Sequence, residues 1–367
     1  MSVIRAKTLD VKQLHPLTET RKKNATLNES EALEGMTILD SYPRRIVLEM
    51  TSACNIRCKM CGRNASDFKP TVFNPKWLEV FEPVTDKIEE VTLLGWGEPT
   101  LHPQFEDFLR WGYEHDLQKF FCTNGTRLKE LKKAIFDYNV ELLTVSLDGA
   151  DADTNNRIRC GADFDTITAN IREIVKEKQR RTVDYPHLSI VMTMMNSNYK
   201  SLPAYIRLAD ELGIQEAKGV YLTVFEDRLL DESMLDKKGE VEEIFEEAEE
   251  LGEKLGIIVK LPYLQGEDVA GEQLHKTCYV GWRDFFLGSD GYVRSCMSTS
   301  KKLFHISKYK SFDEIWNSIE YQQFRGKVNS EGMDLPCKNC YQASFANWNR
   351  KSSFVQIGND FAPEWEG

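Results

Sequence analysis

The most informative segment of the chain reads Leu48-Glu49-Met50-Thr51-Ser52-Ala53-Cys54-Asn55-Ile56-Arg57-Cys58-Lys59-Met60-Cys61. It places three thiols within eight residues, directly after a run that predicts a strand over 46–51. Thiolates are typical ligands of iron–sulfur clusters and of zinc. A structural zinc ion takes four ligands, and no histidine lies between residues 16 and 101 to supply the fourth locally. Three thiolates on a four-iron cluster with one open iron are therefore favoured over a zinc knuckle completed by a distant ligand.

The sequence after this segment alternates between strand-like and helical patterns. Short β-branched and aromatic runs predict strands over 46–51, 90–94, 119–122, 142–147, 188–194 and 219–224. Helical patterns between them cover 75–81, 103–115, 128–138, 165–177 and 202–212. Such alternation predicts a parallel sheet covered by helices, which right-handed crossovers curl into a full or partial barrel. Chemistry in such barrels lies at the carboxyl ends of the strands.

Three short polar motifs fall at these strand ends. Gly95-Trp96-Gly97-Glu98-Pro99 follows the second predicted strand, and its glycines allow a backbone to approach a ligand closely. Thr123-Asn124-Gly125 follows the third strand, and Ser146-Leu147-Asp148-Gly149 ends the fourth. The motifs therefore share one edge of the predicted sheet with the three cysteines.

A second group of cysteines lies near the end of the chain. Cys278 is followed after twelve residues by Gly291 and after four more by Cys296, and Cys337-Lys338-Asn339-Cys340 comes later. A hairpin predicted over 284–294, turned at Ser289-Asp290-Gly291, would bring the first two thiols together. A helix predicted over 311–328 would bring Cys337 and Cys340 back beside the first two thiols. Four thiolates close a coordination sphere, and a structural zinc ribbon is the alternative to an iron–sulfur cluster.

The spacing Cys54-x3-Cys58-x2-Cys61 after the first strand resembles the cluster motif of the radical S-adenosylmethionine (SAM) superfamily. The resemblance implies a [4Fe–4S] cluster whose open iron holds SAM and whose electron cleaves it to a 5′-deoxyadenosyl radical. An external donor such as flavodoxin or ferredoxin would supply that electron. The spacing of the later cysteines resembles the twitch domain, a shortened SPASM domain with an auxiliary [4Fe–4S] cluster on Cys278, Cys296, Cys337 and Cys340. The implied fold is α/β, a partial (β/α)6 TIM-like barrel with a small C-terminal twitch domain.

The resemblance also assigns SAM contacts. Glu98 would balance the SAM ammonium, Ser146 would contact the carboxylate or ribose, and Arg159 would pair with the carboxylate. Met60 replaces the aromatic residue usual before the third cysteine and would pack against the adenine. The remaining expected contacts come from the motif loops: Gly95, Trp96, Gly97, Asn124 and Asp148.

Two cysteines belong to neither group. Cys122 ends a predicted strand, where core packing is the simplest interpretation. Cys160 follows Arg159 in a loop expected to face SAM, so it is a candidate hydrogen donor to a substrate radical, as in radical epimerases.

Composition limits the function further. Lys and Arg total 47 against 58 Asp and Glu, a formal charge of −11 that argues against nucleic acid and anionic membranes as partners. No apolar run approaches the roughly 20 residues of a membrane helix, and residues 1–13 lack the apolar core of a signal peptide, which predicts a cytoplasmic protein. We expect three parts: an extension over 1–44, the barrel over 45–262, and the auxiliary cluster domain with a tail over 263–367.

The twitch resemblance favours oxidation or epimerisation of a polar small molecule, such as a sugar, cyclitol or nucleotide. Maturation of a ribosomal peptide by epimerisation or cross-linking is the first alternative. A non-catalytic iron–sulfur or zinc protein is the second.

Overall fold

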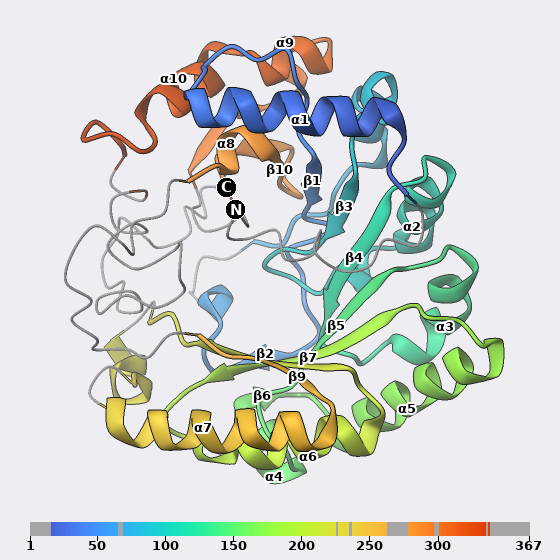
Figure 1. Ribbon diagram of the computed structural model, residues 1–367, viewed down its shortest axis with the longest axis vertical. Coiled ribbons are helices and arrows are strands. Elements are labelled where there is room, and N and C mark those ends of the chain that lie inside the picture. Colours follow the sequence, from blue (N-terminus) through green and yellow to red (C-terminus); the bar gives the residue numbers. More distant parts are fainter. Residues whose placement is uncertain are drawn as a thin grey trace.

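The computed structural model describes residues 16–64, 69–224, 227–234, 237–262, 278–296, 301–334 and 337. Cys340 lies outside the described residues, as does the tail after it. The described chain forms an open barrel in which one curved sheet is wrapped by helices on its outer side (Figure 1).

The sheet contains ten strands among the described residues, in the order β12-β11-β10-β1-β3-β4-β5-β7-β8-β9. A separate ribbon pairs β2 with β6. The strands are β1 (Arg45–Leu48), β2 (Arg57–Cys58), β3 (Glu90–Leu93), β4 (Gln118–Thr123), β5 (Leu142–Ser146), β6 (Arg159–Cys160), β7 (His187–Met194), β8 (Glu216–Tyr221), β9 (Ile258–Lys260), β10 (Asp284–Leu287), β11 (Tyr292–Arg294) and β12 (Lys302–His305). Every neighbouring pair from β10 to β9 is parallel, and β11 and β12 are added antiparallel.

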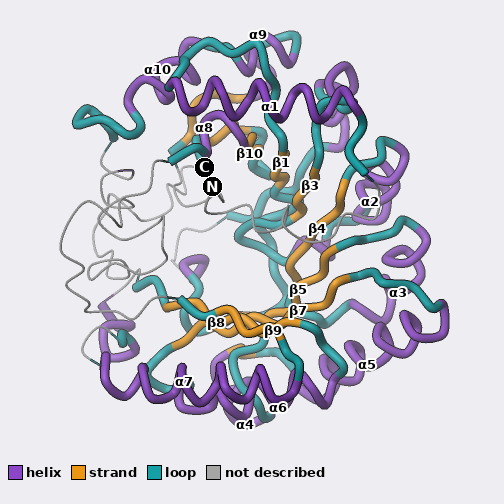
Figure 2. Tube along the Cα trace, viewed as in Figure 1, coloured by secondary structure: helices purple, strands orange, loops and turns teal. Residues whose placement is uncertain are grey.

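The helices cover the outer face of this sheet, as the helix and strand colours of Figure 2 show. They are α1 (Glu19–Glu34), α2 (Phe105–Glu114), α3 (Leu128–Asp137), α4 (Ala152–Ile158), α5 (Phe164–Arg181), α6 (Leu202–Leu212), α7 (Lys238–Leu255), α8 (Val280–Arg283), α9 (Phe312–Trp316) and α10 (Ile319–Lys327). Short 3₁₀ turns are η2 (Gly62–Asn64), η3 (Pro75–Val80), η4 (Glu82–Val84), η5 (Pro99–Leu101), η6 (Tyr199–Ser201), η7 (Asp227–Glu232) and η9 (Ile306–Lys308).

The alternation of side chains along β7 shows which face is the core and which is the lumen. Leu188, Ile190, Met192 and Met194 are buried in the core beneath the helices. Side chains of a strand alternate between its two faces. His187, Val191 and Thr193 are accordingly the partly exposed residues of β7 and face the lumen of the barrel. The same alternation along β5 and β8 separates an apolar outer face from a more polar lumen.

The fold class predicted from the sequence is confirmed, with several local differences. Strand β1 ends at Leu48 rather than at residue 51, and the helix predicted over 75–81 is the 3₁₀ turn η3. The strand predicted over 219–224 is β8, which begins at Glu216. Its first residues do not read as a strand in the sequence because Glu216 and Lys218 are polar. The single helix predicted over 311–328 is two helices, α9 and α10. The break occurs because Ser318 caps α10 by accepting from the Tyr321 N–H, while the Asn317 side chain bonds the backbone of Leu39.

The hairpin predicted over 284–294 is present as β10 and β11, with Gly291 in the left-handed region at φ 79°. Its first strand lies parallel to β1, pairing Arg45 with Asp284. Helix α1 contacts α8, and Asn28 donates to the Trp282 carbonyl at 2.8 Å. The described residues before 44 and after 278 thus pack against the barrel, while the division into three parts remains a prediction.

Candidate active site

The three N-terminal cysteines lie in the loop that follows β1. Within this loop β2 pairs antiparallel with β6, so that Cys58 lies opposite Arg159. The Lys59 N–H also donates to the Ile158 carbonyl at 2.9 Å. The cysteine loop is therefore held by a segment about a hundred residues later in the chain, a pairing that brings Arg159 to the cluster position.

The three N-terminal thiols are partly buried. Burial raises the pKa of Cys58 to about 12, with Arg159 opposing that rise. A bound metal replaces the thiol proton and deprotonates such a group outright. No three His, Cys, Asp or Glu side chains of the described residues converge to hold one ion. A zinc ion needs its thiolates within about 2.3 Å of a single point, whereas a four-iron cluster can take each thiolate on a different iron.

Arg159 forms a buried ion pair at the base of this site. Its Nε lies 2.7 Å from Asp148 Oδ2, and its Nη1 lies 3.8 Å from Cys58 Sγ. Asp148 is fully buried, and its other oxygen accepts from the Thr193 N–H. Asp148 was expected to contact SAM itself; in the structure its carboxylate holds the Arg159 guanidinium beside the cysteine thiol.

The glycine-rich loop after β3 packs directly on the cysteine loop. A Cβ on Gly97 would lie 2.3 Å from both the Thr51 and the Ala53 carbonyl oxygens. The Glu98 N–H donates to the Ala53 carbonyl at 2.8 Å, and the Trp96 N–H donates to Glu49 Oε1. Glycine at 97 is therefore required by the contact between the two loops, in addition to any approach of a ligand.

The Glu98 carboxylate has a different environment from the one expected. It is 2% exposed and accepts four hydrogen bonds, two from Thr100, one from the Thr123 hydroxyl and one from the Asn124 N–H. These bonds tie the end of β3 to the end of β4. These hydrogen bonds give Glu98 a positioning role between the two strand ends, and its contact with the SAM ammonium stays a prediction.

The other predicted contacts fall on two sides of the cysteine loop. Asn124 Nδ2 lies 3.8 Å from Cys54 Sγ and donates to Asn55 Oδ1. Ser146 Oγ lies 3.4 Å from Cys122 Sγ in the lumen. Met60 packs against a small apolar group around Met195 at the carboxyl ends of the last strands. Asn124 and Arg159 therefore flank the thiols, and Ser146 lies on the adjoining barrel wall.

Neither Cys160 nor Cys122 has the surroundings that the sequence suggested. In the ribbon of β2 and β6, Cys58 and Arg159 share one face and Arg57 and Cys160 share the other. Cys160 is exposed, on the face away from Cys58. Cys122, expected in the core, is only partly buried and alternates with core residue Phe121, so its thiol faces the lumen. No alternation along 119–122 signals this placement, because Lys119 shares the outer face with Phe121 while Phe120 shares the lumen face with Cys122.

We expect Cys160→Ala to leave SAM cleavage and substrate turnover unchanged within about twofold. An exposed side chain away from the site changes stability by no more than about 0.5 kcal/mol. The measurement is the rate of 5′-deoxyadenosine formation by the reduced protein, with Cys122→Ala assayed in parallel. A Cys160→Ala protein that forms 5′-deoxyadenosine but no product would restore the hydrogen-donor role.

The described cysteines of the second group also gather. Cys278 and Cys296 both pack against Val47, Val280 and Phe286. Burial first, and then the charge of Cys296, raise the pKa of Cys337 to about 12, which places these two thiols within electrostatic reach. Three of the four predicted auxiliary ligands, Cys278, Cys296 and Cys337, thus lie near one another beside strands β1 and β10.

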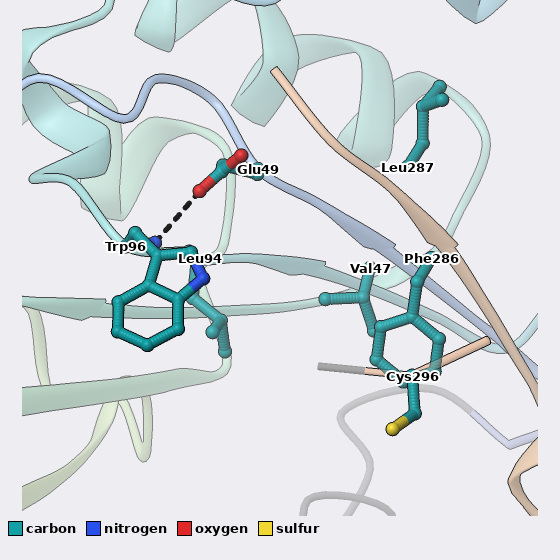
Figure 3. A pocket seen from close by; sticks show the side chains of 8 residues that line it. Val47, Glu49, Leu94, Trp96, Phe286, Leu287 and Cys296 are labelled. Atoms are coloured by element: carbon teal, nitrogen blue, oxygen red, sulfur yellow. Dashed lines mark hydrogen bonds between the residues drawn. The ribbon is translucent and has the colours of Figure 1, made fainter. Parts of the chain in front are cut away.

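A cavity of about 230 Å³ lies between the glycine-rich loop after β3 and Cys296 of the second cysteine group. Figure 3 shows its walls, with the Trp96 ring on one side and the Cys296 thiol beneath Phe286 on the other. The lining is Val47, Glu49, Leu94, Gly95, Trp96, Phe286, Leu287 and Cys296. Glu49, which sequence analysis passed over, joins both sides: its carboxylate accepts from the Trp96 N–H and from Ser289.

Comparison with known families places both cysteine groups in established domains. The model of the Radical SAM superfamily matches residues 48–209, and the model of SPASM, an iron–sulfur cluster-binding domain, matches residues 278–341. The first match covers the cysteine loop and the strand-end motifs, and the second covers all four later cysteines.

Three relatives show the range of similar proteins. The tungsten-containing aldehyde ferredoxin oxidoreductase cofactor-modifying protein of Pyrococcus furiosus is 26% identical over 76% of this chain and 82% of its own. Mycofactocin maturase MftC of Mycobacterium tuberculosis is 24% identical over 47% of this chain and 43% of its own. The crystal structure of Streptococcus suis SuiB bound to SAM superimposes with a TM-score of 0.64 at 14% identity, covering 83% of this chain and 72% of that one. That last likeness concerns the fold.

Among the described residues, no helix is both long and apolar enough to span a bilayer.

Proposed function

The chain belongs to the radical SAM superfamily with a SPASM-type iron–sulfur domain, and from this we propose that it modifies a peptide substrate by hydrogen abstraction. SAM and the [4Fe–4S] cluster supply a 5′-deoxyadenosyl radical when bound at the first site. Cys54, Cys58 and Cys61 would hold the cluster. Arg159 and Asn124 would fix the charge and position of its thiolates.

The lining of the cavity beside Cys296 is the observation that carries this proposal. Four of its lining side chains are apolar: Val47, Leu94, Trp96 and Phe286. Its one charged side chain, Glu49, already accepts hydrogen bonds from both neighbouring loops. A sugar or cyclitol needs a hydrogen-bond partner for each buried hydroxyl, and this lining offers few. An apolar side chain of a peptide suits it better.

The relatives point the same way. MftC is named a maturase, and the Pyrococcus furiosus protein is named for modifying a cofactor. SuiB, whose fold this chain shares, has been solved with its precursor peptide SuiA. The complex with SuiA favours the peptide alternative over the polar small molecule that the twitch resemblance first suggested, whereas the name of the Pyrococcus furiosus protein favours neither.

The experiment is an anaerobic assay of the reconstituted full chain with SAM, a reductant and pools of synthetic peptides rich in apolar residues. We expect selected peptides to increase 5′-deoxyadenosine formation and to change in mass. The protein with alanine at all three N-terminal cysteines is the matched control. Stimulation by sugars, cyclitols or nucleotides, with none by peptides, would contradict the proposal.

The product class follows from the same assay in D2O. Deuterium at an inverted carbon would identify an epimerase, because the returned hydrogen then comes from a solvent-exchangeable donor. Loss of two hydrogens without deuterium would identify an oxidation or cross-link, with the second electron passing to the auxiliary cluster. We favour the second outcome, because the described auxiliary thiols gather near the cavity while Cys160 faces away from Cys58.

A further inference from the structure

Two lysines lie on the lumen wall that faces the cavity across the open barrel. Lys218 of β8 is in register with Val191 of β7 and with Lys260 of β9, and Val191 is in register with Ser146 of β5. The four residues therefore form one transverse row on one face of the sheet. In Figure 1 strands β7 and β9 lie on the opposite side of the barrel from β1 and β10.

The burial pattern shows that this row faces the lumen. On β8, Ala217 and Tyr221 belong to the helix-covered core, so Lys218, one residue from Ala217, points to the other face. On β9, Val259 packs against the same core and Lys260 alternates with it. The charge of Lys218 also reaches the thiol of Cys122, whose Sγ lies 3.4 Å from Ser146 Oγ. Lys218 is thus close to the wall where SAM is expected.

The two ammonium groups share one buried carboxylate. Lys218 Nζ lies 2.7 Å from Glu216 Oε1, and Lys260 Nζ lies 2.7 Å from Glu216 Oε2. Glu216 is 2% exposed, while each lysine side chain is 30% exposed. Within the described ranges neither lysine has a second carboxylate at ion-pair distance. His187 Nε2 also lies 3.4 Å from Glu216 Oε2. The two lysines and the carboxylate alone have a net charge of +1, and each ammonium has three N–H donors of which Glu216 occupies one.

We propose that Lys218 and Lys260 form a subsite for a carboxylate of the substrate. This inference rests on the proposed function, because in a peptide the group would be an Asp or Glu side chain or the terminal carboxylate. Glu216 holds both ammonium groups in place and lowers the electrostatic cost of keeping two like charges together. A substrate carboxylate would complete the neutralisation and take the remaining donors through charge-assisted hydrogen bonds. An apolar side chain of the same peptide would occupy the cavity on the opposite wall.

SAM is the other possible source of a carboxylate in this barrel. The substrate is favoured because the first site already has Arg159 beside the thiols, with its guanidinium 3.8 Å from Cys58 Sγ. Lys218 and Lys260 continue the row from Ser146 toward the edge of the sheet at β9, two and three strands away from Ser146.

The test measures binding of glutarate, a five-carbon dicarboxylate, to the SAM-loaded full chain by equilibrium dialysis, with glutaramide as the uncharged probe. We expect saturable binding of glutarate in the low-millimolar range. Lys218→Gln or Lys260→Gln should weaken it by at least about tenfold, the effect of losing a hydrogen bond to a charged group. Lys260→Arg should retain it. Lys237→Gln, at a lysine equally exposed at 30% and paired with Glu240, is the control that should change nothing.

Glutarate binding that is absent, or unaffected by both lysine variants, would overturn the subsite. A loss of SAM affinity in these variants, with glutarate binding unchanged, would assign the lysines to SAM and overturn it as well. A peptide pair that differs only by Glu against Gln tests the inference in turnover: the wild type should prefer Glu, and Lys218→Gln should lose that preference. If glutarate binding depends on both lysines but no peptide is modified, the subsite stands and the peptide function fails.

Discussion

Replacing Cys54, Cys58 and Cys61 together with alanine is expected to abolish 5′-deoxyadenosine formation and to lower the iron content of the reconstituted chain from about eight to about four per molecule. Each cluster of the [4Fe–4S] type takes its iron only where thiolates anchor it. The three thiols lie in a loop fixed by the pairing of β2 with β6, so the change removes the ligands of one site.

The auxiliary cluster should survive this change. Cys278 and Cys296 pack against the apolar group of Val47, Val280 and Phe286, apart from the N-terminal cysteine loop. Iron analysis together with ultraviolet–visible absorption measures both effects, and Cys160→Ala is the matched control for loss of a thiol outside both groups. Retention of all the iron in the triple variant, or tightly bound zinc with no iron absorption in the wild type, would refute the assignment of two clusters.

Arg159→Leu is expected to lower the free energy of unfolding by about 3–5 kcal/mol, because it leaves the Asp148 carboxylate charged and buried without its partner. The side chains of this pair are 9% and 0% exposed, so solvent screens their interaction weakly. The same change removes a positive charge 3.8 Å from Cys58 Sγ and should weaken SAM binding. Urea denaturation of the apoprotein gives the stability, and equilibrium binding to the reconstituted protein gives the SAM affinity.

A double variant separates loss of the pair from loss of the site. The double variant Arg159→Leu/Asp148→Leu removes both charges. Its loss in the free energy of unfolding should be smaller than the sum of the losses of the two single variants. Arg157→Ala is the control, since Arg157 is exposed and its guanidinium donates to the Ser197 carbonyl at 3.4 Å. Its substitution should change the free energy of unfolding by no more than about 0.5 kcal/mol. An Arg159→Leu protein as stable as the wild type would show that Asp148 is satisfied without it.

The sequence predicted the cluster chemistry because that chemistry is local. Cys54, Cys58 and Cys61 lie within eight residues, so their spacing alone limits what they can bind. The fold class followed for the same reason, since each strand and helix shows its period within its own residues. Two of the boundaries that were misplaced, at Glu216 and at Asn317, lie where polar residues of an element are satisfied by distant parts of the chain: Glu216 by Lys260, and Asn317 by Leu39.

The roles within the site depended on tertiary structure. The Glu98 carboxylate accepts hydrogen bonds from Thr123 and Asn124, which are 25 and 26 residues away in sequence. Cys160 faces away from Cys58 only because of the register in which β6 pairs with β2. Shifting a pairing by one residue moves a side chain to the opposite face, and the register between segments a hundred residues apart is set by the packing of the whole barrel. The same pairing of strands places Lys218 and Lys260 on one row of the lumen, where no spacing within the sequence would have joined them.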